Sequence, residues 1–191
     1  MKHALILDLE TTGLCHKNDE IIEIGLIGFN ISEDYKSIIT NCYSSLNEPQ
    51  CSLSNITKTI TGLTDESLKG HSIDWDFVIN QLHLSDVVIA HNMDFDRSFL
   101  KNNEQIRKLQ LHWACSQNHI SWADHGHTTK ALNYLAADHG FVNPFAHRAL
   151  FDCATTYKLI APYLKELITN SYKRQVLILA TKAPFDKKDI L

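Results

Sequence analysis

Two short, mostly apolar runs, each followed by a polar block that contains two acidic residues, restrict most strongly the folds open to this chain. Residues 4–7 (Ala-Leu-Ile-Leu) lead into Asp8 and Glu10, and residues 86–90 (Asp-Val-Val-Ile-Ala) lead into a second polar block. Apolar runs of this length are typical of buried strands. Because alternate residues of a strand share a face, Asp8 and Glu10 should lie side by side, with Leu9 on the opposite face. We expect both carboxylates at the carboxyl edge of a central strand, where α/β folds usually place their sites.

The rest of the chain predicts a single α/β domain. Residues 21–29 and 37–43 should add two strands in an antiparallel meander, and residues 111–115 a fifth strand. A meander followed by strands that alternate with helices predicts a mixed sheet with helices on both faces. Helices are expected in part of 55–68, at 72–84 with Ser72 as the N-cap, after His91, at 128–139, and at 146–167 with a break at Pro162.

Composition narrows the class of protein. A length of 191 residues suits about one domain, and 44% apolar with 21% charged residues is a normal globular balance. The net charge of −4 provides no overall basic field for long nucleic acids, which favours binding of a strand end at a local site. The five cysteines lack a C-x-x-C pair and predict reduced thiols and a cytoplasmic location. Neither a signal segment nor an apolar stretch of the about 20 residues that span a bilayer is expected.

The second and third polar blocks add carboxylates and a histidine. Residues 91–96 (His-Asn-Met-Asp-Phe-Asp) open an expected helix, and in residues 147–152 (His-Arg-Ala-Leu-Phe-Asp) His147 precedes Asp152 by five positions. Hard divalent cations such as Mg²⁺ prefer oxygen ligands and keep positions open for substrate and water. Two such ions about 3.5–4 Å apart can stabilise both the attacking and the leaving oxygen. Four carboxylates and a histidine therefore indicate metal-assisted hydrolysis of a phosphodiester.

The three blocks together resemble the motifs of the DEDDh exonucleases, the family of the epsilon proofreading subunit, RNase T and oligoribonuclease. The resemblance covers roughly residues 3–165 and includes the complete H-x-A-x-x-D spacing. It implies a ribonuclease H-like exonuclease fold with a mixed five-stranded sheet. It also implies a 3′→5′ exonuclease that uses two Mg²⁺ or Mn²⁺ ions to release nucleoside 5′-monophosphates from single-stranded DNA or RNA ends.

The resemblance assigns roles to the acidic residues and the histidine. It makes His147 the general base, since the ordinary pKa of histidine lies near neutrality. Of the two aspartates in the second block, Asp96 matches the family's carboxylate, whereas Asp94 falls on a variable position. Residues two apart on a helix do not share a face, which agrees with a choice of one. The expected metal ligands, which are also catalytic, are Asp8, Glu10, Asp96 and Asp152.

Six further residues resemble the family's substrate contacts. The turn after the first block is expected to hold the terminal sugar, because a glycine lets backbone and ligand approach closely. An apolar side chain should meet the terminal base, an aromatic one the penultimate nucleotide, and a loop at residues 60–64 should wedge between bases. These expected contacts are Thr11, Thr12, Gly13, Leu14, Ile60 and Phe95.

Several alternatives stay open from the sequence. Leu14 and Phe95 could instead belong to the core, and Arg148 could either pair with a phosphate or face solvent. His125 and His127 could bind a soft metal, but no third ligand has suitable spacing, so a second, zinc-type site is not expected. An exonuclease domain is expected at residues 1–172 and a tail or accessory segment at 173–191. The competing functions are a short-RNA nuclease of the oligoribonuclease type and a polymerase-associated proofreading module that acts mainly through binding.

Overall fold

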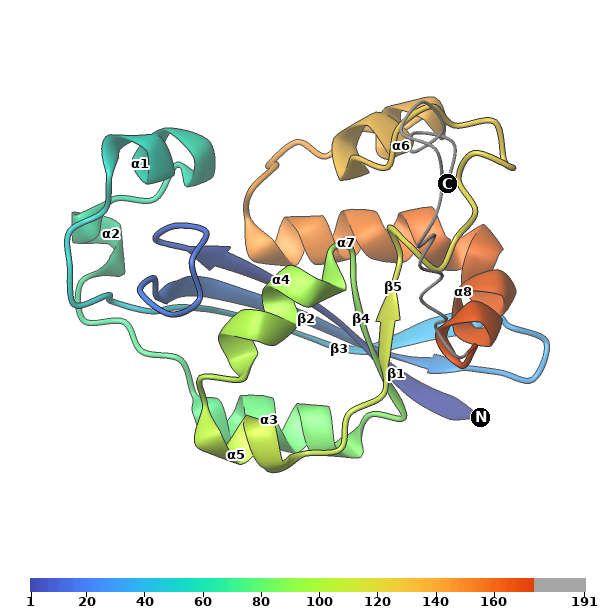
Figure 1. Cartoon of the computed structure of the whole chain (residues 1–191), viewed down its shortest axis with the longest axis horizontal. Helices are drawn as coiled ribbons and strands as arrows, with labels where there is room; N and C mark the ends of the chain where they lie inside the picture. Colours follow the sequence, from blue (N-terminus) through green and yellow to red (C-terminus); the bar gives the residue numbers. More distant parts are fainter. Residues whose placement is uncertain (174–191) are drawn as a thin grey trace, which may run out of the picture.

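The computed structural model describes residues 1–173, which fold around one five-stranded mixed sheet (Figure 1). The first three strands form the expected antiparallel meander, and the last two run parallel to the first. The first strand is therefore central. In the order β3-β2-β1-β4-β5 the strands are β3 (Ser37–Leu46), β2 (Ile21–Ile31), β1 (Lys2–Thr11), β4 (Val87–Ala90) and β5 (Trp113–Cys115).

Helices cover both faces of the sheet, as the sequence predicts. One face packs against α3, α4 and α5, and the other against α7 and α8, with α6 next to α7. The helical segments are α1 (Asn55–Thr61), α2 (Asp65–Leu68), α3 (Trp75–Leu84), α4 (Met93–Leu100), α5 (Glu104–Lys108), α6 (Leu132–Asp138), α7 (Ala149–Ile160), the 3₁₀ turn η1 (Ala161–Tyr163) and α8 (Leu164–Ser171).

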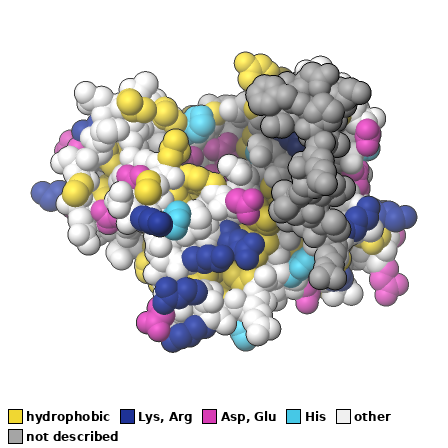
Figure 2. All heavy atoms as spheres, viewed as in Figure 1, with side chains coloured by type: hydrophobic (Ala, Val, Ile, Leu, Met, Phe, Trp, Pro, Cys, Tyr) yellow, Lys and Arg dark blue, Asp and Glu magenta, His cyan; other side chains and the backbone are white. Residues whose placement is uncertain are grey.

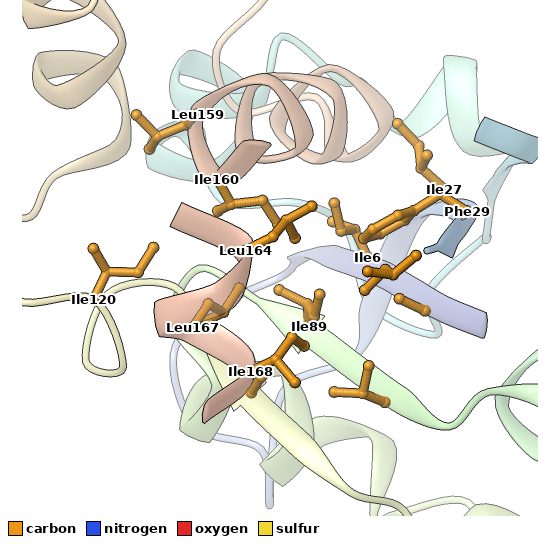
Figure 3. Close-up of a cluster of buried hydrophobic side chains, with 14 of the residues drawn as sticks. Ile6, Ile27, Phe29, Ile89, Ile120, Leu159, Ile160, Leu164, Leu167 and Ile168 are labelled. Carbon is orange, nitrogen blue, oxygen red and sulfur yellow. The ribbon is translucent and has the colours of Figure 1, made fainter. Parts of the chain in front are cut away.

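The alternation of β1 decides which face carries the acidic residues. Leu5, Leu7 and Leu9 pack under α3 and α4, whereas Ile6 belongs to the cluster under α7 and α8. Figure 3 shows Ile6 in that cluster with residues of β2 and β4 and of both helices. Because side chains alternate along a strand, Asp8 and Glu10 continue the face of Ile6. The carboxylates of Asp8 and Glu10 therefore lie on the same face of the sheet as the core under α7, at the carboxyl end of β1.

Gly25 on β2 allows α7 to approach this face closely. It lies opposite Asp8 in the β1–β2 ladder, and a Cβ atom at this position would collide with the backbone of Ala149 and Leu150. The thiol of Cys153 also donates to the carbonyl oxygen of Gly25 at 3.2 Å. Without a side chain at Gly25, the first turn of α7 reaches the level of the acidic residues on β1.

The helix starts differ from those expected at three places, and one of them is the helix predicted from residue 146, which begins at Ala149. The helix predicted at 72–84 begins at Trp75, because Asp74 rather than Ser72 accepts from the backbone N–H of Phe77. The helix predicted at 128–139 begins only at Leu132. Thr129 Oγ1 accepts from the backbone N–H of Ala131, and this turn replaces the expected first helical turn.

Three further differences concern loops and breaks. Ile60 lies in α1 rather than in a loop, and α5 was not expected at all. The predicted break at Pro162 is confirmed, since η1 separates α7 from α8 there. Nearly all of the tail predicted at 173–191 lies outside the described residues. None of the described helices is long and apolar enough to cross a membrane.

Candidate active site

A pocket of about 640 Å³ opens at the carboxyl end of β1. Figure 2 shows acidic side chains recessed beside a histidine, with hydrophobic side chains along the rim. The pocket is lined by side chains from β1 and the turn after it, α1, the exit of β4 with α4, the start of α6, and the segment around α7. These include Asp8, Glu10, Thr11, Gly13, Leu14, Ile56, Ile60, His91, Asn92, Phe95, Asp96, Asn133, Tyr134, His147 and Asp152.

The two aspartates of the second block lie in different places. Asp96 on α4 is 3% exposed and lines the pocket, whereas Asp94 in the first turn is exposed and lines a separate cleft. The helical spacing thus separates them as expected. Asp96 is the member of the pair that joins Asp8 and Glu10.

The segment before α7 folds back so that His147 reaches Asp152. His147 has a φ of 62°, in the left-handed region that few residues other than glycine adopt. Its backbone N–H donates to Asp152 Oδ2 at 2.9 Å, and Asn143 Nδ2 donates to Asp152 Oδ1 at 2.6 Å. Ligand atoms of Glu10, His147 and Asp152 all lie within 4.8 Å of one another. The turn at His147 therefore closes the five-residue gap that a helix alone would leave open.

The carboxylates are held in an environment that opposes their charge. Burial, followed by repulsion from Asp152, Glu23 and Asp96, raises the pKa of Glu10 to about 8. Burial likewise raises the pKa of Asp96 to about 8 and the pKa of Asp152 to about 6. The pKa of Asp8 is also raised well above its usual value, first by burial and then by four neighbouring carboxylates, those of Asp96, Asp152, Glu10 and Glu23. These groups would ionise more readily beside a cation than they do beside one another.

The donor set fits hard divalent cations. Four carboxylates that face one pocket offer only oxygen ligands, which Mg²⁺ and Mn²⁺ prefer. The guanidinium of Arg148, whose charge acts on Glu10, is bound to Glu23. Metal ions would therefore supply the missing positive charge at Asp8, Glu10, Asp96 and Asp152.

Arg148 takes neither of the two roles considered from the sequence. Its Nε and Nη2 donate to the carboxylate of Glu23 at 3.1–3.2 Å, and the backbone N–H of Ala149 donates to Glu23 Oε2 at 3.2 Å. Glu23 is only 1% exposed. This ion pair fixes the start of α7, and with it His147, against β2. The signal that sequence reasoning missed is a lone glutamate inside the Ile-rich run at 21–29.

Five of the six expected substrate contacts line the pocket, namely Thr11, Gly13, Leu14, Ile60 and Phe95. The sixth, Thr12, does not line it. Its hydroxyl donates to Asp19 and its carbonyl oxygen accepts from Thr57, so it ties the turn to α1. Leu14 is 87% exposed, which rules out the core alternative for that residue. Phe95 packs on Phe99 with 4.9 Å between ring centroids and still faces the pocket.

Comparison with known proteins now decides the family. The model of the exonuclease family RNase_T matches residues 5–160. The chain belongs to the RNase_T exonuclease family. The resemblance to DEDDh exonucleases and the fold class that it implied are thereby confirmed.

Curated relatives of this RNase_T exonuclease domain include bacterial polymerases. The chain is 35% identical over 102 residues to the PolC-type DNA polymerase III of Thermotoga maritima, an overlap of 51% of the chain and 7% of the polymerase. It is 25% identical over 173 residues to the PolC-type polymerase of Pediococcus pentosaceus, an overlap of 85% of the chain and 11% of that protein. The chain thus spans about a tenth of the length of these relatives.

Solved structures of exonucleases share the fold. Exonuclease X in complex with 5′ overhanging duplex DNA superposes with a TM-score of 0.65 at 21% identity, over 88% of this chain and 99% of that one. E. coli exonuclease I in complex with a dT13 oligonucleotide gives a TM-score of 0.73 at 13% identity, over 88% of this chain and 42% of that one. At these identities the likeness establishes the fold alone.

Two residues that line the pocket, His91 and Tyr134, had no role there assigned from the sequence. His91 supports the turn after β4, because its ring nitrogens bond Ser116 Oγ at 2.8 Å and the carbonyl oxygen of Lys130 at 2.7 Å. This contact also holds the segment that leads into α6. Tyr134 on α6 is 69% exposed and lines the pocket. It departs from the apolar stripe of its helix, which is the signal that could have identified it.

Proposed function

We propose that this RNase_T-family domain is a 3′→5′ exonuclease that removes nucleoside 5′-monophosphates from single-stranded nucleic acid with two divalent metal ions. One observation carries the proposal: four carboxylates and His147 from three separate segments converge in one pocket. The pocket's volume of about 640 Å³ lies within the usual range for small-ligand sites. A strand end fits such a site better than the middle of a duplex.

The carboxylates serve as metal ligands in this proposal. Asp8, Glu10, Asp96 and Asp152 would hold the ions, and metal binding would displace the protons that the raised pKa values of Glu10 and Asp96 retain. Bound Mg²⁺ or Mn²⁺ would stabilise the attacking and leaving oxygens of the phosphodiester. Asn143 and the backbone of His147 keep the carboxylate of Asp152 in one orientation.

His147 is the proposed general base. Its side chain is exposed at the pocket, so it is open to both water and substrate. A ring nitrogen would accept a proton from the attacking water as the bond to phosphorus forms. The Glu23–Arg148 ion pair, one residue away, keeps the backbone of this segment in place.

The rim of the pocket suits the last nucleotides of a strand. Leu14, Ile60 and Phe95 present apolar surface on which bases can stack without sequence preference. Thr11 and Gly13 place backbone close to the carboxylates, as contact with a terminal sugar requires. None of these contacts selects between DNA and RNA.

Two second candidates concern the substrate and the partner. A short-RNA nuclease of the oligoribonuclease type would use the same pocket with the same chemistry. The PolC-type relatives favour a link to a DNA polymerase, in which the domain would proofread or act mainly through binding. A cytoplasmic location stays a prediction from the sequence.

The test of the proposal is degradation of 5′-labelled DNA and RNA oligonucleotides with Mg²⁺ or Mn²⁺. We expect stepwise shortening that requires metal and yields 5′-monophosphates. Faster turnover of two- to five-nucleotide RNA than of any longer strand would favour the oligoribonuclease alternative. Binding without turnover under every metal condition would favour the polymerase-associated binding module.

A further inference from the structure

A second cleft, of about 450 Å³, lies on the face that carries α4 and α5. Basic side chains gather on this face in Figure 2. We call this cleft the basic cleft. Its lining residues are His16, Asp94, Arg97, Ser98, Lys101, Asn102 and Arg107.

Within residues 1–173, the cations of the basic cleft lack acidic partners. Among the described residues, no carboxylate lies within 4.0 Å of the charged nitrogens of Arg97, Lys101 or Arg107. Lys108, the neighbour of Arg107, does have such a partner, since its Nζ lies 2.8 Å from Glu104. Three cations and one carboxylate, that of Asp94, leave the cleft with a charge of +2. The whole chain carries −4, so this local excess runs against the overall charge.

The basic cleft is separate from the active-site pocket, but two elements line both of them. On α4, Phe95 and Asp96 line the pocket, whereas the next residue, Arg97, lines the cleft. In the turn after β1, Leu14 lines the pocket and His16 lines the cleft. Asn102 Nδ2 donates to the carbonyl oxygen of His16, which joins these two elements at the cleft. A chain that leaves the pocket over α4 would therefore enter the cleft.

We propose that the basic cleft binds phosphates of the substrate strand on the 5′ side of the nucleotides held in the pocket. This inference rests on the proposed function, since it assumes a strand end in the pocket. Arg and Lys side chains contact phosphates through charge-assisted hydrogen bonds, and each contact releases counterions. The cleft would thus grip strands that are long enough to reach it, without reading their sequence.

The experiment measures binding of single strands of three and of twelve nucleotides by fluorescence anisotropy, with Ca²⁺ in place of Mg²⁺ and across a range of salt. The double variant Lys101→Gln/Arg107→Gln removes two cations that touch no catalytic residue. For two lost phosphate contacts on a single strand, the slope of log K against log salt should become shallower by about 1.4. Between 50 and 200 mM salt this corresponds to about a sevenfold smaller loss of affinity for the twelve-mer. The three-mer, which ends before the cleft, should bind as it does to the unchanged protein.

Matched variants separate the cleft from general charge and from folding. Lys108→Gln removes a cation one residue away that is paired with Glu104, and it should leave the salt slope unchanged. Lys101→Arg/Arg107→Lys keeps both charges and should retain the slope of the unchanged protein. The inference is overturned by an unchanged slope in the double Gln variant, by equal losses for both lengths, or by an equal effect of Lys108→Gln. If the twelve-mer binds through the basic cleft but is never hydrolysed with Mg²⁺, the proposed function is wrong. The role of the basic cleft in binding the strand would still hold.

Discussion

Arg148 and Glu23 are 125 positions apart in the chain, and the guanidinium of one is bound to both carboxylate oxygens of the other. The pair connects the third acidic block to β2. It also lies at the point where Gly25 lets α7 approach the sheet closely. The position of His147 in the pocket therefore depends on a contact that belongs to neither the metal ligands nor the substrate contacts.

Arg148→Met should destabilise the protein and lower turnover. It leaves the buried carboxylate of Glu23 without its partner, which costs about 1–3 kcal/mol. Urea unfolding measures this loss, and the double variant Glu23→Gln/Arg148→Met should recover part of it. Arg107→Met, at an exposed arginine that has no acidic partner among residues 1–173, is the control. If the loss in free energy of unfolding lies within about 0.5 kcal/mol of the loss in the control, the ion pair does not stabilise the fold.

Asp96→Ala should abolish turnover, because a metal ligand and the two-ion geometry are lost together. Asp94→Ala should retain turnover at saturating substrate and cost only a few tenths of a kcal/mol, since a negative charge in the first helical turn is mildly favourable. Initial rates with Mg²⁺ and thermal unfolding check the two variants side by side. Equal and severe losses of turnover would undo the assignment of Asp96 over Asp94.

His147→Asn should lower the chemical step by roughly 10²–10⁴-fold, the usual contribution of a general base. Asparagine tolerates a positive φ, so the turn and its bond to Asp152 should persist. Single-turnover rates measure the loss, and calorimetric titration should find metal affinity nearly normal. A variant that no longer binds metal would make His147 a ligand instead.

The parts of the site that the sequence predicted follow from local periodicity. The two-residue period of a strand brings Asp8 and Glu10 together, and helical spacing separates Asp96 from Asp94. The same reasoning recovers the meander, the central position of β1 and the break at Pro162. Except for the central position of β1, which also needs its pairing with β4, these features depend on residues close together in the chain.

The parts that were missed depend on tertiary contacts or on single turns. The partner of Arg148 is a glutamate on another strand, which no spacing within the third block could indicate. The helix α5 is a single turn capped by Asn103 with only Ile106 buried, so it shows almost no periodicity. The role of Tyr134 at the rim depends on how α6 lies beside the pocket.

The metal-free protein should lose stability as pH rises from about 4.5 to about 8. The pKa values of Glu10 and Asp96 are raised to about 8, mainly by burial, so the folded state keeps protons that the unfolded chain has already released. The unfolded state then binds fewer protons, and the free energy of unfolding falls with rising pH. Melting curves with EDTA at about pH 5 and about pH 8 measure this trend.

Added Mg²⁺ or Mn²⁺ should raise the melting temperature more at the higher pH, because metal and protons compete for the same carboxylates. If the melting temperature of the metal-free protein rises with pH, folding does not raise the pKa values of these carboxylates. The double variant Glu10→Gln/Asp96→Asn should flatten the pH dependence and abolish the response to metal.

The most direct test of a 3′→5′ exonuclease compares three forms of one single strand, labelled at the 5′ end or internally: a free 3′ end, a 3′-phosphate, and a closed circle. With Mg²⁺ or Mn²⁺ the free end should be shortened one nucleotide at a time with release of 5′-monophosphates, and Asp96→Ala should remove this activity. The 3′-phosphate should block shortening and the circle should stay intact, because the pocket requires a free terminal sugar. Cleavage of the circle, or shortening that persists without divalent metal, would contradict the assignment.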